Sequence, residues 1–128
     1  MDATRCFPVV YAESAERAAA FYERLGFARH FQLPPEGEPG YVGLRRGEAE
    51  LAVVDRAWPR DTLGTEVGAA PRFELFTYVD DVDATVDELR RDGVAVLRDP
   101  EDMPWGERVG YVADPDGNPV ALAVQASA

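Results

Sequence analysis

The chain of 128 residues contains no lysine and has only one cysteine and one histidine. The single cysteine, Cys6, cannot form an internal disulfide, which excludes a small scaffold held by disulfides and favours a reducing compartment. No segment approaches the roughly 18 consecutive apolar residues of a membrane span, and the N-terminus lacks a basic region followed by an apolar run. We therefore expect a soluble, cytoplasmic protein.

The charge is strongly one-sided. Thirteen arginines stand against 24 aspartate and glutamate residues, so the formal net charge is −11 at pH 7. Such a chain repels nucleic acid and anionic membranes, and neither is expected as a partner. The same field attracts cationic ligands, although a negative surface also serves simply to keep a protein soluble. The length and the 46% content of hydrophobic residues fit one domain with a core of its own.

The chain contains an internal repeat, which decides the expected fold. Moving residues 7–27 onto 74–94, a shift of 67 positions, aligns them without a gap and places Tyr11 on Tyr78. A shift of 70 then places Gly40-Tyr41-Val42 on Gly110-Tyr111-Val112. Two matched segments in the same order indicate an old duplication.

Each half predicts a strand, a helix and three further strands. Ser14 and Asp81 are the candidate N-caps of the two helices, and Gly26 and Gly93 stand where each helix should end. The expected strands are residues 8–11, 27–33, 41–45 and 50–55, then 75–79, 94–98, 110–113 and 120–125. The fold class is therefore α+β, with two βαβββ repeats whose curved mixed sheets pair around a cleft. A single domain covers residues 1–128, with repeat one at 5–57, a linker at 58–71 and repeat two at 72–126.

Three motifs carry a family resemblance. The helix end FYERLGF (21–27), the opening YVDDVDATVDELRRDGV (78–94) and the closing DPDGNPVALA (114–123) resemble the vicinal oxygen chelate superfamily, which includes glyoxalase I, extradiol dioxygenases and bleomycin-resistance proteins. The run MPWGER (103–108) resembles the bleomycin-resistance proteins in particular. This resemblance implies a homodimer that binds drug at the subunit interface, with the first strand exchanged near Pro8. Proline at the start of an ordinary edge strand is an equal alternative.

The same resemblance locates the metal ligands of the family's enzymes. The matching positions here are Phe7, Leu51, Glu74 and Ala121, with Glu50 in place of Leu51 if that strand is displaced by one residue. Phenylalanine, leucine and alanine cannot bind a divalent ion, which needs several oxygen or nitrogen donors. His30 lies in a strand where the family has no ligand, and we expect it at the surface. Neither a metal nor another cofactor is expected.

The candidate ligand-binding residues are side chains expected on the inner sheet faces or in adjoining loops: Phe7, Phe31, Tyr41, Leu51, Trp58, Glu74, Phe76, Tyr78, Trp105, Arg108 and Tyr111. Aromatic rings provide flat surfaces for stacking, and a few polar groups set the orientation of a ligand. Alternation along one strand places Glu74, Phe76 and Tyr78 on one face. Tyr41 and Tyr111 are expected at matching positions of the two halves. Phe76 as an ordinary core residue, and Glu74 paired with Arg72 or Arg108, are the structural alternatives.

These observations predict a metal-free binding protein that confers drug resistance by sequestration. The expected ligand is an aromatic or cationic natural product, such as a bleomycin-type glycopeptide, an enediyne or another aromatic polyketide, which is released unchanged. The alternative is an enzyme. It would be a metal-independent isomerase, cyclase or lyase with Glu74 as general base, or a metal-dependent glyoxalase-like or dioxygenase-like enzyme using Glu50, Glu74 and a residue of a partner chain.

Overall fold

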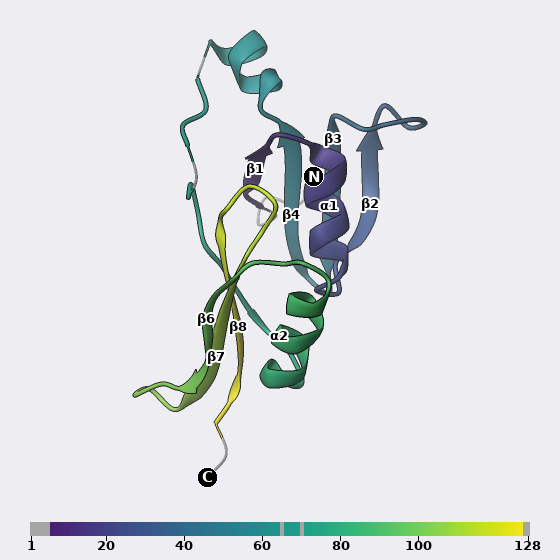
Figure 1. The fold of residues 1–128 in the computed structure, drawn as a ribbon. Coiled ribbons are helices and arrows are strands. Elements are labelled where there is room, and N and C mark those ends of the chain that lie inside the picture. The colour runs from purple at the N-terminus through teal and green to yellow at the C-terminus, as the bar shows by residue number, and fades with distance from the viewer. Residues whose placement is uncertain (1–5, 65, 70, 127–128) are drawn as a thin grey trace. The chain divides into compact units, whose positions relative to one another are not determined.

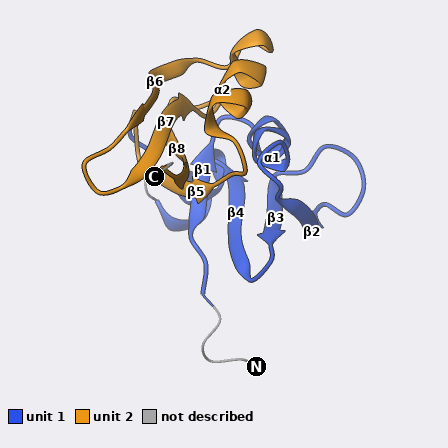
Figure 2. Ribbon diagram, turned by 90° about the horizontal axis from the view of Figure 1, so that it is seen from below, with its two compact units in different colours: residues 1–68 blue, residues 69–128 orange. Residues whose placement is uncertain are grey.

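The structure is a computed structural model that describes residues 6–64, 66–69 and 71–126. It divides into two compact units, Met1–Gly68 and Ala69–Ala128 (Figure 2). Each unit contains one four-stranded sheet and one α-helix in the order βαβββ, which confirms the predicted repeat. Residue 5, where the first repeat was expected to begin, lies outside the described residues.

The first unit has strands in the order β1-β4-β3-β2, with β1 parallel to β4 and the other pairs antiparallel (Figure 1). Its elements are β1 (Val9–Ala12), α1 (Ala15–Glu23), β2 (Ala28–Leu33), β3 (Tyr41–Arg46) and β4 (Ala49–Asp55). A short helix, η1 (Pro59–Leu63), then follows in the segment predicted to be only a linker. Pro59 is the first residue of η1, where its fixed φ and missing N–H suit a helix start.

The second unit repeats this topology in the order β5-β8-β7-β6. Its elements are β5 (Leu75–Tyr78), α2 (Val82–Arg91), β6 (Val96–Asp102), β7 (Glu107–Ala113) and β8 (Pro119–Gln125). The β6–β7 hairpin is longer than the sequence predicted, because β6 continues through Pro100 and β7 begins at Glu107. The register is irregular between Arg98 and Glu101, and such an irregularity accommodates a proline that cannot donate to the ladder.

Local sequence signals set the limits of both α-helices. The hydroxyl of Ser14 accepts a hydrogen bond of 3.1 Å from the backbone N–H of Arg17, and the carboxylate of Asp81 accepts one of 3.0 Å from Ala84. Both predicted N-caps are therefore confirmed. No helix in the described parts of the chain is long and apolar enough to cross a lipid bilayer.

Each helix covers one face of its own sheet and leaves the other face open. In the first unit, Arg29 lies opposite Leu44 and forms two hydrogen bonds with Glu16 of α1, at 2.9 and 2.7 Å. The side of β3 that carries Val42 and Leu44 therefore faces α1 and is buried. Because side chains alternate along a strand, Tyr41 and the other odd-numbered residues of β3 lie on the open face.

The second sheet is arranged in the same way. A Cβ atom on Gly110 would lie 3.1 Å from Val86 of α2, so the even-numbered side of β7 packs against the helix. The odd-numbered residues from Glu107 to Ala113 therefore belong to the open face. These two open faces carry most of the candidate ligand-binding residues.

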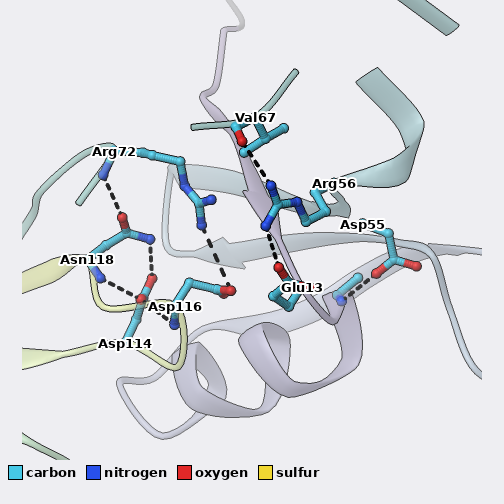
Figure 3. A network of polar contacts seen from close by, with 9 residues as sticks. Glu13, Asp55, Arg56, Val67, Arg72, Asp114, Asp116 and Asn118 are labelled. Carbon is cyan, nitrogen blue, oxygen red and sulfur yellow. Dashed lines mark hydrogen bonds and ion pairs between the residues drawn. The ribbon is translucent and has the colours of Figure 1, made fainter. Parts of the chain in front are cut away.

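The DPDGN motif forms a structural turn between β7 and β8 (Figure 3). The carboxylate of Asp114 accepts hydrogen bonds of 2.9 Å from the N–H of Asp116, 2.8 Å from the N–H of Asn118 and 2.9 Å from the Asn118 amide. The side-chain amide oxygen of Asn118 in turn accepts a hydrogen bond of 2.8 Å from the backbone N–H of Arg72. Asp114 and Asn118 are both buried. This motif, part of the family resemblance, therefore holds the hairpin together.

A second polar network closes the end of β4 in the first unit (Figure 3). The carboxylate of Asp55 accepts a hydrogen bond of 2.8 Å from the N–H of Ala15, the first residue of α1. The guanidinium of Arg56 pairs with Glu13 and donates a hydrogen bond of 2.8 Å to the carbonyl of Val67. The segment after η1 is thereby tied back to its own unit.

Candidate functional site

The open face of the first sheet carries two adjoining pockets that share Tyr41. Across the ladder, Tyr11 of β1 lies opposite Val54 of β4, and Val54 lies opposite Tyr41 of β3. Arg45 and Glu50 face each other farther along the same two strands. We call the pocket at the tyrosine row the apolar pocket and the pocket at the Arg45–Glu50 row the charged pocket.

The apolar pocket has a volume of about 800 Å³. Its lining comes from β1, β3, β4, the end of β2 and the start of the segment around η1: Val9, Tyr11, Leu33, Pro34, Gly40, Tyr41, Val54, Asp55, Ala57, Trp58, Asp61 and Thr62. Trp58 is 48% exposed, and Val9 and Leu33 are also exposed. The pocket thus offers accessible aromatic and aliphatic surface with few charges.

The charged pocket has a volume of about 600 Å³. It is lined by Phe7, His30, Phe31, Tyr41, Gly43, Arg45, Glu50 and Leu51. The rings of Phe31 and Tyr41 meet edge to face, with centroids 5.9 Å apart. Four predicted ligand-binding residues, Phe7, Phe31, Tyr41 and Leu51, therefore surround this single pocket.

His30 is exposed, as the sequence predicted, and its side chain lines the charged pocket. Arg29 pairs with Leu44 and Phe31 pairs with Gly43, so His30 is an extra residue in the β2–β3 ladder. A β-bulge of this kind interrupts the alternation and redirects a side chain. The imidazole lies over Gly43, where an added Cβ would be only 3.1 Å from Nε2. The glycine leaves the space that this imidazole occupies.

Glu50, and not Leu51, points its side chain toward the open face. Glu50 lies opposite Arg45 in the ladder, whereas Leu51 lies opposite Leu44 on the side covered by α1 and is 3% exposed. The carboxylate of Glu50 is 3.5 Å from His30 Nε2 and 3.7 Å from an Arg45 nitrogen. Leu51 lines the pocket from the side that α1 covers. Glu50 therefore takes the place on the open face that was first assigned to Leu51, which is the alternative with the strand displaced by one residue.

The residues at the family's metal positions do not fit a divalent cation. Phe7 and Ala121 offer no donor atom, and the carboxylate of Glu50 already faces two nitrogen-bearing side chains. Among the residues that the structure describes, no three histidine, cysteine, aspartate or glutamate side chains gather where they could hold a metal ion. A catalytic zinc ion normally has three protein ligands.

The open face of the second sheet carries three aromatic rings around one carboxylate. Tyr78 donates a hydrogen bond of 2.6 Å to one oxygen of Glu107, and the indole N–H of Trp105 donates one of 2.8 Å to the other oxygen. The ring of Phe76 lies 5.7 Å from that of Tyr78. All three rings are exposed, with Trp105 at 58%. The bond to the Glu107 carboxylate raises the pKa of Tyr78.

Tyr111 packs beside this patch, but it does not match Tyr41. In the ladder, Tyr41 lies opposite Val54, which lies opposite Tyr11. The equivalent row of the second sheet runs Tyr78, Ala123 and Val109, so Val109 takes the place of Tyr41. Tyr111 lies two residues farther along β7, opposite Ala121. Tyr111 instead packs against the buried cluster of Val109, Ala121 and Ala123.

Two predicted charges lie elsewhere than expected. Glu74 precedes the first residue of β5 and is exposed, so it is not the mid-strand carboxylate that the pattern indicated. Arg108 lies on the even-numbered side of β7, where it forms two hydrogen bonds of 2.8 and 2.9 Å with Asp83 of α2 and another of 3.2 Å with Asp102. These bonds lower the pKa of Asp83 and raise that of Arg108. Arg108 is therefore a residue of the helix-facing side.

The sequence did not predict several residues of the two pockets and of the aromatic patch. Tyr11 could have been found, because it aligns with Tyr78 in the repeat and alternation would have selected both. Glu107 lies two positions after Trp105 in a recognised motif, but its contact with Tyr78 spans 29 positions and has no local signal. His30 depends on a bulge that alternation cannot indicate.

Residues 7–122 match the model of the Glyoxalase/Bleomycin resistance protein/Dioxygenase superfamily. The chain belongs to this superfamily. It is 31% identical to the protein YraH of Bacillus subtilis (strain 168) over 93 residues, which cover 68% of this chain and 73% of YraH.

Two solved structures illustrate the range of proteins that share the superfamily fold. A lactoylglutathione lyase from Agrobacterium tumefaciens superposes with a TM-score of 0.69 and 22% identity, over 96% of this chain and 95% of the lyase. A bleomycin-binding protein complexed with bleomycin superposes with a TM-score of 0.60 and 24% identity, over 93% and 96% of the two chains. The fold thus occurs in both an enzyme and a drug-binding protein, and the residues of this chain must decide between them.

Proposed function

We propose that this protein is a metal-independent binding protein that sequesters an aromatic natural product and releases it unchanged. The apolar pocket of the first unit is the observation that carries this proposal. Its volume of about 800 Å³ lies in the range of about 300–1,000 Å³ typical of small-molecule sites. Walls formed by Tyr11, Tyr41 and Trp58 suit a flat, conjugated ligand, because aromatic rings favour stacked or edge-to-face contacts.

The chemistry of the metal positions supports binding over metal-assisted catalysis. Phe7 stands where the resemblance places a first ligand, and its ring lines the charged pocket together with those of Phe31 and Tyr41. Glu74, the general base of the competing metal-independent mechanism, is an exposed residue outside the β5 strand. An exposed carboxylate lacks the desolvation that makes such a group an effective base at neutral pH.

The ligand class that we propose is an antibiotic that carries a flat conjugated group, such as a bleomycin-type glycopeptide, an enediyne or an aromatic polyketide. The family name and the bleomycin-binding structure of the same fold support this choice. A homodimer belongs to the same proposal. Light scattering coupled to size exclusion tests it, and a species of the 14.1 kDa chain mass would contradict it.

The decisive experiment is a fluorescence titration with EDTA present, using two single-tryptophan proteins. Trp105→Phe leaves Trp58 as the reporter of the apolar pocket, and Trp58→Phe leaves Trp105 as the reporter of the second unit. We expect bleomycin or an aromatic polyketide to change the emission of Trp58 with a Kd at or below about 1 μM, equivalent to roughly −8 kcal/mol. Mass analysis and chromatography of the recovered ligand should find it unaltered.

Each other outcome has a clear meaning. A ligand recovered with a changed mass, or as an isomer, would make the protein an enzyme and refute sequestration. Emission changes confined to Trp105 would move the binding site to the aromatic patch of the second unit. No saturable binding of any member of the panel would refute the proposed antibiotic ligand.

A further inference from the structure

The side chain of Arg45 is available to a ligand of the charged pocket. It is 50% exposed, and its single polar contact within the described parts of the chain is with Glu50, at 3.7 Å. That separation is too long for a hydrogen bond. A guanidinium carries five N–H donors in a planar fork. Those of Arg45 therefore donate to no acceptor among the residues that the structure describes.

Strand β3 places Arg45 in line with the wall that the two pockets share. Tyr41, Gly43 and Arg45 are alternate residues of β3, so all three lie on the open face of the first sheet. Tyr41 lines both pockets, whereas Arg45 lines only the charged pocket. Four residues at about 3.3 Å each separate Tyr41 from Arg45 by roughly 13 Å. Gly43 lies between them without a side chain, and about 600 Å³ remains open there beside the imidazole of His30.

The two adjoining pockets offer different chemistry to a ligand. The apolar pocket presents the rings of Tyr11, Tyr41 and Trp58, and the charged pocket presents the free donors of Arg45. We infer that the two pockets form one site for an elongated ligand, with an aromatic group in the apolar pocket and a carboxylate at the other end paired with Arg45. This inference rests on the proposed function, since it specifies which aromatic ligands are preferred.

A carboxylate suits Arg45 better than a neutral acceptor does. Its two oxygens match two parallel N–H donors of a guanidinium, and such charge-assisted bonds are stronger than bonds to a neutral group. Glu50 faces the guanidinium from one side, so a ligand on the other side has Arg45 between its own carboxylate and that of Glu50. The formal net charge of −11 repels anions at long range, but physiological salt screens charges separated by more than about 8 Å.

The experiment uses four probes: 4-(1-naphthyl)butanoate, 1-naphthoate and the primary amide of each. Calorimetric titration of the wild-type protein at neutral pH should give about fivefold tighter binding of the butanoate than of its amide, the size expected for a half-exposed ion pair. 1-Naphthoate should show no such preference over its amide. Its carboxylate is attached directly to the ring and cannot reach Arg45 while the ring lies in the apolar pocket.

Three variants separate the two ends of the site. Arg45→Gln should remove the preference for the butanoate and leave the affinity for its amide unchanged, and it should fold normally because the side chain is half exposed. Arg46→Gln is the matched control, because it removes an arginine from the helix-facing side of the same strand and should keep the preference. Trp58→Ala should weaken binding of the butanoate and of its amide by the same factor, since it alters only the aromatic end.

Four results would overturn the inference. Equal affinity of the wild-type protein for the butanoate and its amide would leave the proposed aromatic binding intact but remove the role of Arg45. Equal losses of the preference in Arg45→Gln and Arg46→Gln would point to overall charge instead of this pocket. A preference as large for 1-naphthoate as for the butanoate would refute the division of the ligand between two pockets. Failure of all four probes to bind, when bleomycin or an aromatic polyketide does bind, would refute the inference while sparing the proposed function.

Discussion

The hydroxyl of Tyr78 donates a hydrogen bond of 2.6 Å to the carboxylate of Glu107, which also accepts the indole N–H of Trp105. One carboxylate therefore sets the positions of two exposed rings that come from β5 and from the β6–β7 turn. Neither ring is held by burial, so the hydrogen bonds provide the orientation that packing provides in a core.

This relationship predicts a change in the ionisation of Tyr78. Loss of the phenolic proton would break the hydrogen bond to Glu107 and also place two negative charges side by side, and the hydrogen bond is the main reason that Glu107 raises the pKa of Tyr78. Glu107→Gln should therefore lower that pKa toward the usual tyrosine range. The measurement is the absorbance of tyrosinate during alkaline titration, with Tyr78→Phe identifying the contribution of Tyr78. Glu101→Gln, on neighbouring β6, should leave the curve unchanged, and an equal shift in that variant would contradict the assignment.

Trp58 should dominate the affinity of the apolar pocket. Truncation by Trp58→Ala removes a stacking wall and should weaken binding of the planar ligand at least about tenfold. Because the side chain is 48% exposed, we expect the free energy of unfolding to fall by less than about 1 kcal/mol. Trp105→Ala is the matched control for loss of an exposed tryptophan. A larger loss of affinity in Trp105→Ala than in Trp58→Ala would contradict this prediction.

The DPDGN turn should be important for stability. Asn118→Ala would leave the N–H of Arg72 and an oxygen of Asp114 without the bonds that the amide now makes. An unsatisfied buried polar group costs about 1–3 kcal/mol, so we expect roughly 2 kcal/mol less stability by urea unfolding. Gln125→Ala, which removes an exposed amide at the far end of β8, should change stability by less than about 0.5 kcal/mol. Similar losses in the two variants would refute a special role for the turn.

Stability should fall at acidic pH through the pairing of α1 with β2. The two hydrogen bonds from Arg29 lower the pKa of Glu16 below its ordinary value of 4.5. The unfolded chain therefore takes up this proton at higher pH than the folded protein. The stabilisation is complete above about pH 4.5 and is lost as the pH falls through the lowered pKa.

The measurement is the free energy of unfolding at a series of pH values from neutral to acid. Glu16→Gln should give a shallower decline than the wild-type protein, because its side chain takes up no proton. Glu13→Gln is the matched control, because the carboxylate of Glu13 pairs with Arg56 and lies away from Arg29. A decline as steep in Glu16→Gln as in the wild-type protein would exclude the proposed linkage.

The pattern of strands and helices could be predicted because its signals are local. Ser14 and Asp81 satisfy backbone donors three positions away, and Gly26 and Gly93 adopt φ values of 93° and 89° that other residues avoid. The repeat then supplied each element twice, so weak signals in one half were supported by the other. Only η1 and the true length of the β6–β7 hairpin were missed among the elements.

The composition of the sites depended on register, which local signals do not determine. A single bulged residue placed His30 over Gly43 and next to Glu50, and the register of β7 on β8 put Val109 where Tyr111 was expected. A shift of one residue reverses the face on which a strand's side chains lie. The sequence by itself thus determined the superfamily, the repeat and the supply of aromatic rings. Only the tertiary structure decided which rings share a pocket with a carboxylate, because bulges and long-range hydrogen bonds join residues distant along the chain.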